Sequence, residues 1–109
     1  MYVAHRLDAS VMEDRATEAE AFLRSLASRH RLMILCSLLD GEMSVGELTS
    51  RLGLAQSNLS RHLAMLRAED LVATRRDGVT IHYHITSERV RPILTELYRL
   101  FCAPDQEGV

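Results

Sequence analysis

The sequence predicts a mainly α-helical chain with one β-hairpin, and three observations carry this prediction. Apolar residues recur at spacings of three and four in several stretches, as they do in amphipathic helices. Two of these stretches are separated only by a tight turn at Gly53. Further along, Asp77-Gly78 stands between two strand-like runs, which is the strongest short signal for a hairpin. With 109 residues the chain has room for one domain, residues 1–109, with loose tails expected over 1–10 and 104–109.

Two helices are expected before the turn at Gly53. The first covers residues 12–26, and its inward positions are Ala16, Ala19, Phe22, Leu23 and Leu26. The second covers about 29–39 and ends at Asp40-Gly41; its apolar stripe consists of Leu32, Leu35, Cys36 and Leu39.

The stretch from residue 44 to 66 predicts two helices joined by a tight turn. The first helix places Val45, Leu48 and Leu52 on one face, with Gly53 at a C-cap that requires a positive φ. The second places Leu59, Leu63 and Leu66 inward. Its opposite face carries short polar groups and a guanidinium that suit base edges and phosphates: Gln56, Ser57, Asn58, Ser60 and Arg61. This pattern is typical of a DNA-reading helix-turn-helix; an uninvolved helical hairpin would more often carry Glu and Lys there.

The hairpin that follows completes a winged helix-turn-helix. Its expected strands are 71–76 and 79–86, and along the second strand Val79, Ile81, Tyr83 and Ile85 are expected on a buried face. Paired arginines stand at the tip, where a wing meets the DNA backbone or minor groove, although arginines are also common on solvated surfaces. The predicted DNA contacts are Gln56, Ser57, Asn58, Ser60, Arg61 and His62 on the second helix, and Arg75, Arg76, Thr80 and His82 on the hairpin.

A last helix, about residues 88–102, has more apolar surface than one side of a small domain uses: Val90, Ile93, Leu94, Leu97, Tyr98 and Phe101. Together with the N-terminal helix it predicts a homodimer, since symmetric DNA half-sites require a two-fold protein. Phe22, Leu94, Leu97 and Phe101 are expected in that interface.

Charge and composition exclude several classes of protein. The net charge of −2 argues against a bulk polyanion binder but leaves operator binding open, since the charge is segregated. Residues 51–84 carry five arginines against three acids, whereas the first 28 residues carry five acids against three arginines. Neither a membrane-spanning run nor a signal peptide is recognisable, so we expect a cytoplasmic protein.

Three segments resemble the ArsR/SmtB-type family of small dimeric repressors. Residues 26–35 are similar to the family's "L-A-x-x-x-R-L-x-I-L" helix, and residues 57–67 to its "S-x-x-S-x-H-L-x-x-L-R" recognition helix. Leu71-Val72 and the run 75–78 match its wing. The resemblance covers about residues 20–102 and implies a DNA-binding repressor whose affinity for its operator falls when an inducer binds.

This sequence has few suitable metal ligands at the positions where family members bind metal. Ser44 and Gly46 stand where arsenic and cadmium sensors have a Cys-x-Cys, and the last helix offers Glu88 and Glu96 but no histidine. His82 and His84 share a strand face, but exposed pairs of this kind are more often simply solvated. We therefore expect neither a metal nor another cofactor, and a metal-responsive repressor is the weaker alternative.

Cys36 and Cys102 are the only cysteines. Taken by themselves, they read as a small buried residue and an incidental residue near the chain end. The resemblance changes this reading, because the BigR- and SqrR-type persulfide-responsive repressors have one cysteine in the same helix as Cys36 and one in the last helix. It implies that the thiols react with reactive sulfur species to form a di- or polysulfide bridge that releases DNA. Arg99 stands one turn before Cys102, and we expect its charge to favour the thiolate of Cys102.

Three other functions stay open at this point. A peroxide-responsive repressor would form a plain Cys36–Cys102 disulfide, and mass shifts distinguish the two products. A thiol oxidoreductase is disfavoured because the chain lacks Cys-x-x-Cys, and we expect no enzymatic activity. A winged helix that binds only proteins is disfavoured by the polar recognition face, and salt-dependent DNA binding would decide.

Overall fold

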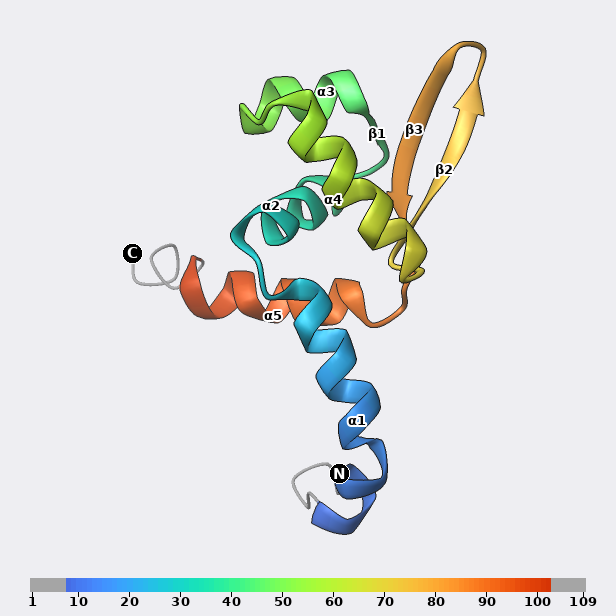
Figure 1. Cartoon of the computed structure of the whole chain (residues 1–109). Helices are drawn as coiled ribbons and strands as arrows, with labels where there is room; N and C mark the ends of the chain where they lie inside the picture. The colour runs from blue at the N-terminus through green and yellow to red at the C-terminus, as the bar shows by residue number, and fades with distance from the viewer. Residues whose placement is uncertain (1–7, 103–109) are drawn as a thin grey trace.

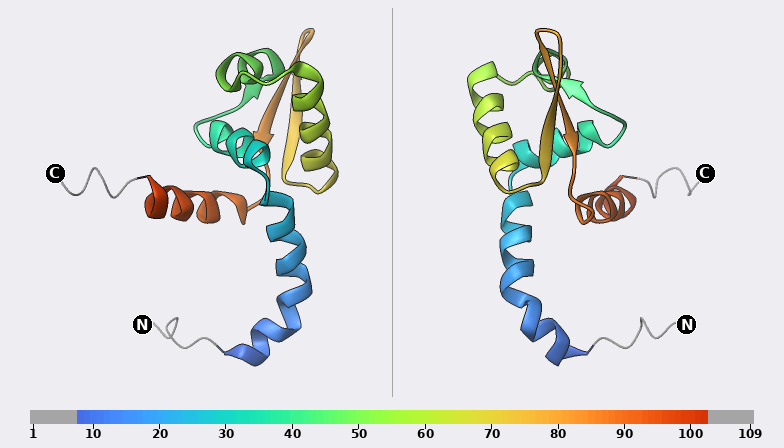
Figure 2. Two further views of the ribbon diagram at one scale, coloured as in Figure 1. Left: turned by 60° about the vertical axis from the view of Figure 1, so that its left-hand side comes forward. Right: turned by 90° about the vertical axis from the view of Figure 1, so that its right-hand side faces the viewer.

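The structure of the chain, a computed structural model, describes residues 8–102 and confirms the winged helix-turn-helix fold (Figure 1). The elements follow in the order α1 (Ala9–Leu26), α2 (Arg29–Leu38), β1 (Met43–Ser44), α3 (Val45–Leu52), α4 (Gln56–Ala68), β2 (Val72–Asp77), β3 (Thr80–Ile85) and α5 (Val90–Phe101). Helices α2, α3 and α4 form a cluster beside the hairpin, while α1 projects away from them (Figures 1 and 2).

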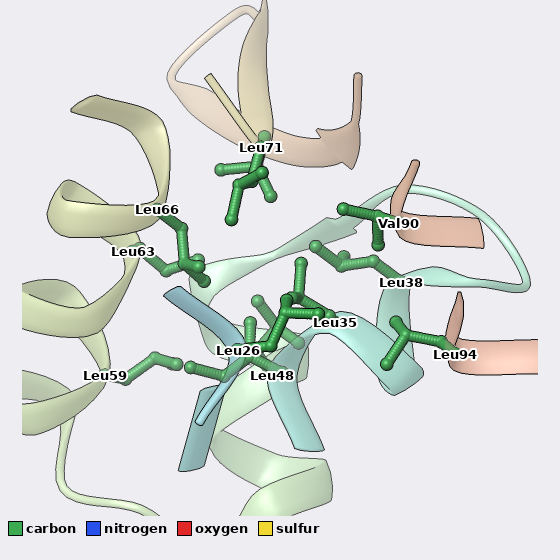
Figure 3. Packing of buried hydrophobic residues seen from close by; sticks show 12 residues of the cluster. Leu26, Leu35, Leu38, Leu48, Leu59, Leu63, Leu66, Leu71, Val90 and Leu94 are labelled. Carbon is green, nitrogen blue, oxygen red and sulfur yellow. The ribbon is translucent and has the colours of Figure 1, made fainter. Parts of the chain in front are cut away.

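The core forms where α2, α3 and α4 meet the base of the hairpin and the start of α5 (Figure 3). Leu48, Leu59, Leu63 and Leu66 are completely buried, which confirms the inward faces predicted for the helix-turn-helix. The stripe predicted for α2 is only partly right. Leu35 is completely buried, but so are Ile34 and Leu38, whereas Leu32, Cys36 and Leu39 are half-buried at its edge.

A three-stranded antiparallel sheet, in the order β1-β3-β2, attaches the wing to the helices. The strand β1 was not expected, since two residues are too few to show an alternating pattern. The wing's two-residue loop is Gly78-Val79, because Asp77 still pairs with Thr80. Gly78 has φ 66°, as the first central position of a type II′ turn requires.

The buried face predicted for the second strand is wrong at its outer end. Val79 is 97% exposed and Ile81 is 38% exposed, because the wing extends beyond the helices there. Only Tyr83 and Ile85, near the base, pack against the core.

Local hydrogen bonds explain where the helices of the helix-turn-helix begin and end. At α3, Ser44 Oγ accepts from the Glu47 amide while the Glu47 carboxylate accepts from the Ser44 amide, which forms a capping box. At its other end Gly53 adopts the left-handed conformation, with φ 69°, as predicted.

The terminal helices are less buried than their sequences predict. In α1 only Ser25 and Leu26 are buried, and Leu23 is 54% exposed. The predicted inward face at Ala16 and Leu23 is therefore wrong within one chain, because no other element covers that face among residues 8–102. In α5, Val90 and Leu94 are buried in the core, while Phe101 is 79% exposed.

The predicted N-terminal tail is too long. Asp8 caps α1 by accepting from the Ser10 amide, so residues 8–10 belong to the helix and its cap. Residues 1–7 and the predicted tail 104–109 lie outside the described residues. Within the described part, no helix is long and apolar enough to cross a membrane.

Candidate nucleic-acid interface and thiol pair

Helix α4 presents the polar face that the sequence predicts. Its inward leucines fix its rotation against α2 and α3, and this leaves five side chains exposed: Gln56, Ser57, Asn58, Ser60 and Arg61. Arg61 donates to the Asn58 side chain at 3.3 Å, so the two polar groups lie together one turn apart. Within the described residues no side chain caps the start of α4, so its first amides point outward with the positive end of the helix dipole. The face combines short polar side chains and a guanidinium with a favourable electrostatic end.

His62 does not belong to this face, and its predicted position there is wrong. The side chain is only 8% exposed, and its ring packs edge-to-face on His30 of α2, with ring centroids 5.4 Å apart. Burial lowers the pKa of His62, and the positive charges of Arg61 and Arg31 lower it further. Its Nδ1 has no hydrogen-bond partner within residues 8–102. His62 therefore helps attach α4 to α2.

The four residues predicted on the wing have different surroundings. Arg76 and Thr80 are exposed close to the turn, facing Ile81 and Asp77 across the hairpin. His82 is half-buried opposite Arg75. The Arg75 guanidinium is held by Glu42, with Nε 3.0 and 3.1 Å from the two carboxylate oxygens and Nη2 2.6 Å from Oε2.

The two cysteines lie on α2 and just after α5, and these two helices pack against each other. Arg91 of α5 fixes the packing by donating to the Leu39 carbonyl at 2.8 Å, at the end of α2. Both thiols are unbridged; Cys36 is half-buried and Cys102 is exposed. Burial raises the pKa of Cys36, and the charge on Cys102 raises it further. Of the two thiols, Cys102 is the one open to solvent.

Arg99 has a different partner from the one the sequence predicts. Its guanidinium forms an ion pair with Glu96, one turn earlier on α5. The pair is exposed, and the carboxylate offsets much of the field that Arg99 was expected to exert on Cys102. The expected activation of Cys102 by this arginine therefore has little support in the geometry.

Two polar contacts in this region could not be predicted from the sequence. The Glu42–Arg75 ion pair joins residues 33 positions apart, and the His30–His62 contact joins two different helices. No local pattern signals either contact. Across residues 8–102, no group of three or more His, Cys, Asp or Glu side chains is arranged to hold a metal ion.

The structure has the parts of a DNA-binding winged-helix regulator. These are a helix with an exposed polar face, a wing with an exposed arginine and the core that joins them. The profile described as "Bacterial regulatory protein, arsR family" matches residues 28–74. The transcriptional activator HlyU from Vibrio cholerae is 47% identical over 95 residues, which cover 87% of this chain and 88% of HlyU. The chain therefore belongs to the arsR family of bacterial transcriptional regulators and is not an enzyme.

Other relatives agree with this assignment. The biofilm growth-associated repressor from Agrobacterium fabrum is 42% identical over 87% of this chain and 81% of its own length. The crystal structure of the transcriptional repressor BigR from Xylella fastidiosa superposes with a TM-score of 0.84 at 39% identity, over 89% of this chain and 99% of that one. Reduced HlyU from V. cholerae gives 0.79 at 48% identity, over 84% and 96% of the respective chains. These likenesses support the BigR-like subgroup.

Proposed function

We propose that this chain is a cytoplasmic, homodimeric repressor that binds operator DNA while Cys36 and Cys102 are reduced, and leaves it when reactive sulfur species bridge them. The observation that carries the proposal is that Cys36 lies on α2 and Cys102 directly follows α5, two helices that pack against each other. The relatives named as repressors support the direction of regulation, whereas HlyU is named an activator.

The exposures of the two thiols suggest an order of reaction. Cys102 is exposed, so its thiolate meets a persulfide donor R–S–SH first, takes the outer sulfur and expels the thiol R–SH. A second donor converts Cys36 in the same way. The terminal sulfur of one cysteine persulfide then attacks the inner sulfur of the other and expels hydrosulfide, which leaves a three-sulfur bridge. Direct attack by an unmodified thiolate would instead expel hydrosulfide and leave a disulfide.

A longer bridge would also explain selectivity. A disulfide requires Cα atoms within about 7 Å, whereas each added sulfur lengthens the span. A cysteine pair held slightly beyond disulfide reach would respond to sulfur donors and not to peroxide.

Bridging would act on DNA through the terminal helices. It would tie α2, which contacts α4, to α5, whose outer end carries the exposed Phe101 that we assign to the dimer interface. The two recognition helices of a dimer must match half-sites about one DNA turn, roughly 34 Å, apart. A shift of α5 would change that separation, and release requires a coupling of only about 1–3 kcal/mol.

The DNA contacts that we propose follow the exposed face. Gln56, Ser57, Asn58, Ser60 and Arg61 would read bases, and Arg76 and Thr80 would contact the backbone. In the wing, His82 is half-buried and Arg75 is engaged by Glu42, so they are less available for phosphate.

The test compares operator release by wild type, Cys36→Ser and Cys102→Ser after treatment with a persulfide donor or with peroxide, followed by fluorescence anisotropy. All three proteins are expected to bind the operator when reduced, and only wild type is expected to leave it with the donor. Normal release of the Cys102→Ser protein would contradict the sensor role. Equal release of wild type by peroxide would preserve the switch and favour the plain-disulfide alternative.

A further inference from the structure

The ion pair between Glu42 and Arg75 spans the whole sheet of the wing. Arg75 lies on β2 opposite His82 of β3, and Glu42 directly precedes β1, which pairs with the other edge of β3. Neighbouring strands lie about 4.8 Å apart, so the pair joins two outer strands separated by roughly 10 Å. It therefore connects the outer strand of the wing to the segment that leads into α3.

The geometry of this pair is stronger than that of a usual surface ion pair. The Nε of Arg75 donates to both carboxylate oxygens of Glu42, and its Nη2 donates to one of them at 2.6 Å. Arg99–Glu96 within α5 has the same three-contact pattern, whereas the exposed pair Arg15–Glu18 within α1 rests on a single contact at 3.3 Å. The Arg75 guanidinium lowers the pKa of Glu42, and the charges of His82 and His84 lower it further. Glu42 therefore stays ionised, and so able to hold Arg75, well below neutral pH.

The outer half of the wing has little else to hold it in place. Its outer half makes no core contacts, since Val79 and Ile81 are exposed, and β1 contributes only two paired residues. Beyond the level of Ser44 and His82 the hairpin is a two-stranded ribbon, which is free to twist about its base. The one side-chain bridge that the described residues offer between β2 and the segment before α3 is the Glu42–Arg75 pair.

We infer that Glu42 and Arg75 are a positioning pair that sets the angle of the wing relative to α4, so that Arg76 and not Arg75 contacts the DNA backbone. This inference rests on the proposed docking of the wing on DNA. It revises the sequence-based assignment of Arg75, because a guanidinium bound by a carboxylate would have to exchange that partner for a phosphate. Arg76, the next residue, is exposed on the opposite face of the strand.

The test exchanges the two charges, because the double variant Glu42→Arg, Arg75→Glu keeps an ion pair between the same two positions with its polarity reversed. Operator affinity is measured between low and moderate salt for wild type, Arg75→Glu, Glu42→Arg and the double variant, with folding checked by circular dichroism. Each single variant places like charges together and is expected to lose operator affinity about two- to fivefold. The double variant is expected to recover to within twofold of wild type, with an unchanged salt slope. If Arg75 contacts phosphate, the double variant will bind no better than Arg75→Glu.

A milder variant separates a positioning role from simple charge competition. Glu42→Gln removes a negative charge near the DNA, so a competing counter-ion would give tighter binding on its removal. A positioning residue gives weaker binding instead, and tighter binding would overturn the inference.

Arg76→Ala is the control for the docking itself. It is expected to flatten the plot of log affinity against log salt by about one. If that slope stays unchanged, both the proposed docking and this inference fail. If the slope flattens but Glu42→Gln tightens binding, the inference fails alone.

Discussion

The helix-turn-helix body and the two terminal helices differ in how completely one chain buries their apolar residues. In the body, Leu48, Leu59, Leu63 and Leu66 are completely buried. In contrast, the terminal helices leave Leu23 of α1 54% exposed and Phe101 of α5 79% exposed. The core of the helix-turn-helix is therefore complete within one chain, whereas the terminal helices leave apolar surface exposed, and we propose that a second chain covers it. The proposed regulation would therefore act on the terminal helices, away from the core that holds the helix-turn-helix.

The thiol pair lies at the border between these two regions. Cys36 belongs to α2, whose neighbours form the core, and Cys102 follows α5, whose outer turns are exposed. A covalent link between them would restrain the less buried region relative to the more buried one.

The largest effect is expected from Leu63→Ala, which removes a completely buried side chain from α4. The free energy of unfolding should fall by about 2–5 kcal/mol, since the core cannot refill the cavity. Urea denaturation measures this loss. Ser60→Ala, exposed on the same helix, is the matched control and should change stability by less than about 0.5 kcal/mol. Equal effects of the two substitutions would refute the contrast between a buried and an exposed face.

Phe101→Ala tests the exposed apolar surface of the terminal helices. Because the ring is exposed in one chain, its removal should weaken dimerisation and leave the folding of one chain unchanged. The dimer dissociation constant should rise by roughly 5- to 150-fold, corresponding to about 1–3 kcal/mol, in sedimentation equilibrium. Val79→Ala removes an exposed apolar residue from the wing tip and should leave dimerisation unchanged. A wild-type protein that is monomeric at micromolar concentration would remove the dimer altogether.

Arg61→Ala tests the exposed polar face of α4. The loss of a good bidentate base contact should cost on the order of 1–3 kcal/mol of operator affinity and relax the sequence preference. Arg15→Ala, an exposed arginine of α1, is the control and should bind normally. Unaltered operator affinity in the Arg61 variant would mean that α4 docks differently.

The smallest effect concerns pH and the buried imidazole of His62. Because burial depresses its pKa in the folded protein, the unfolded chain binds more protons below the usual value near 6.5. The stability that neutral His62 provides is therefore complete above that value and declines as the pH falls below it. Urea midpoints at pH 7.5 and 5.5 should differ less in His62→Gln than in wild type, while His84→Gln should retain the wild-type difference. The idea fails if both variants behave alike.

The sequence predicts the fold where local signals are strong and loses precision where contacts are distant. The leucine spacing, Gly53 and Asp77-Gly78 are local, so the helix-turn-helix and hairpin are placed nearly to the residue. Burial of Leu94 within the chain was missed, because apolar periodicity gives a face but not its partner. The sequence-based assignment of Leu94 to the dimer interface is wrong, because this side chain is only 1% exposed in one chain.

The candidate site shows the same division. The polar face of α4 follows from helical spacing, yet the inward position of His62 depends on where His30 of α2 meets it. The engagement of Arg75 by Glu42 depends on strand order, which no pattern within the hairpin reveals.

The most direct test of the dithiol switch is the intact mass of the chain, with peptide mapping, in the fraction released from operator DNA by a persulfide donor. We expect an internal link between the Cys36 and Cys102 peptides that carries the mass of at least one added sulfur and disappears on reduction. Released protein with both thiols unlinked, or with only one of them modified, would contradict the switch.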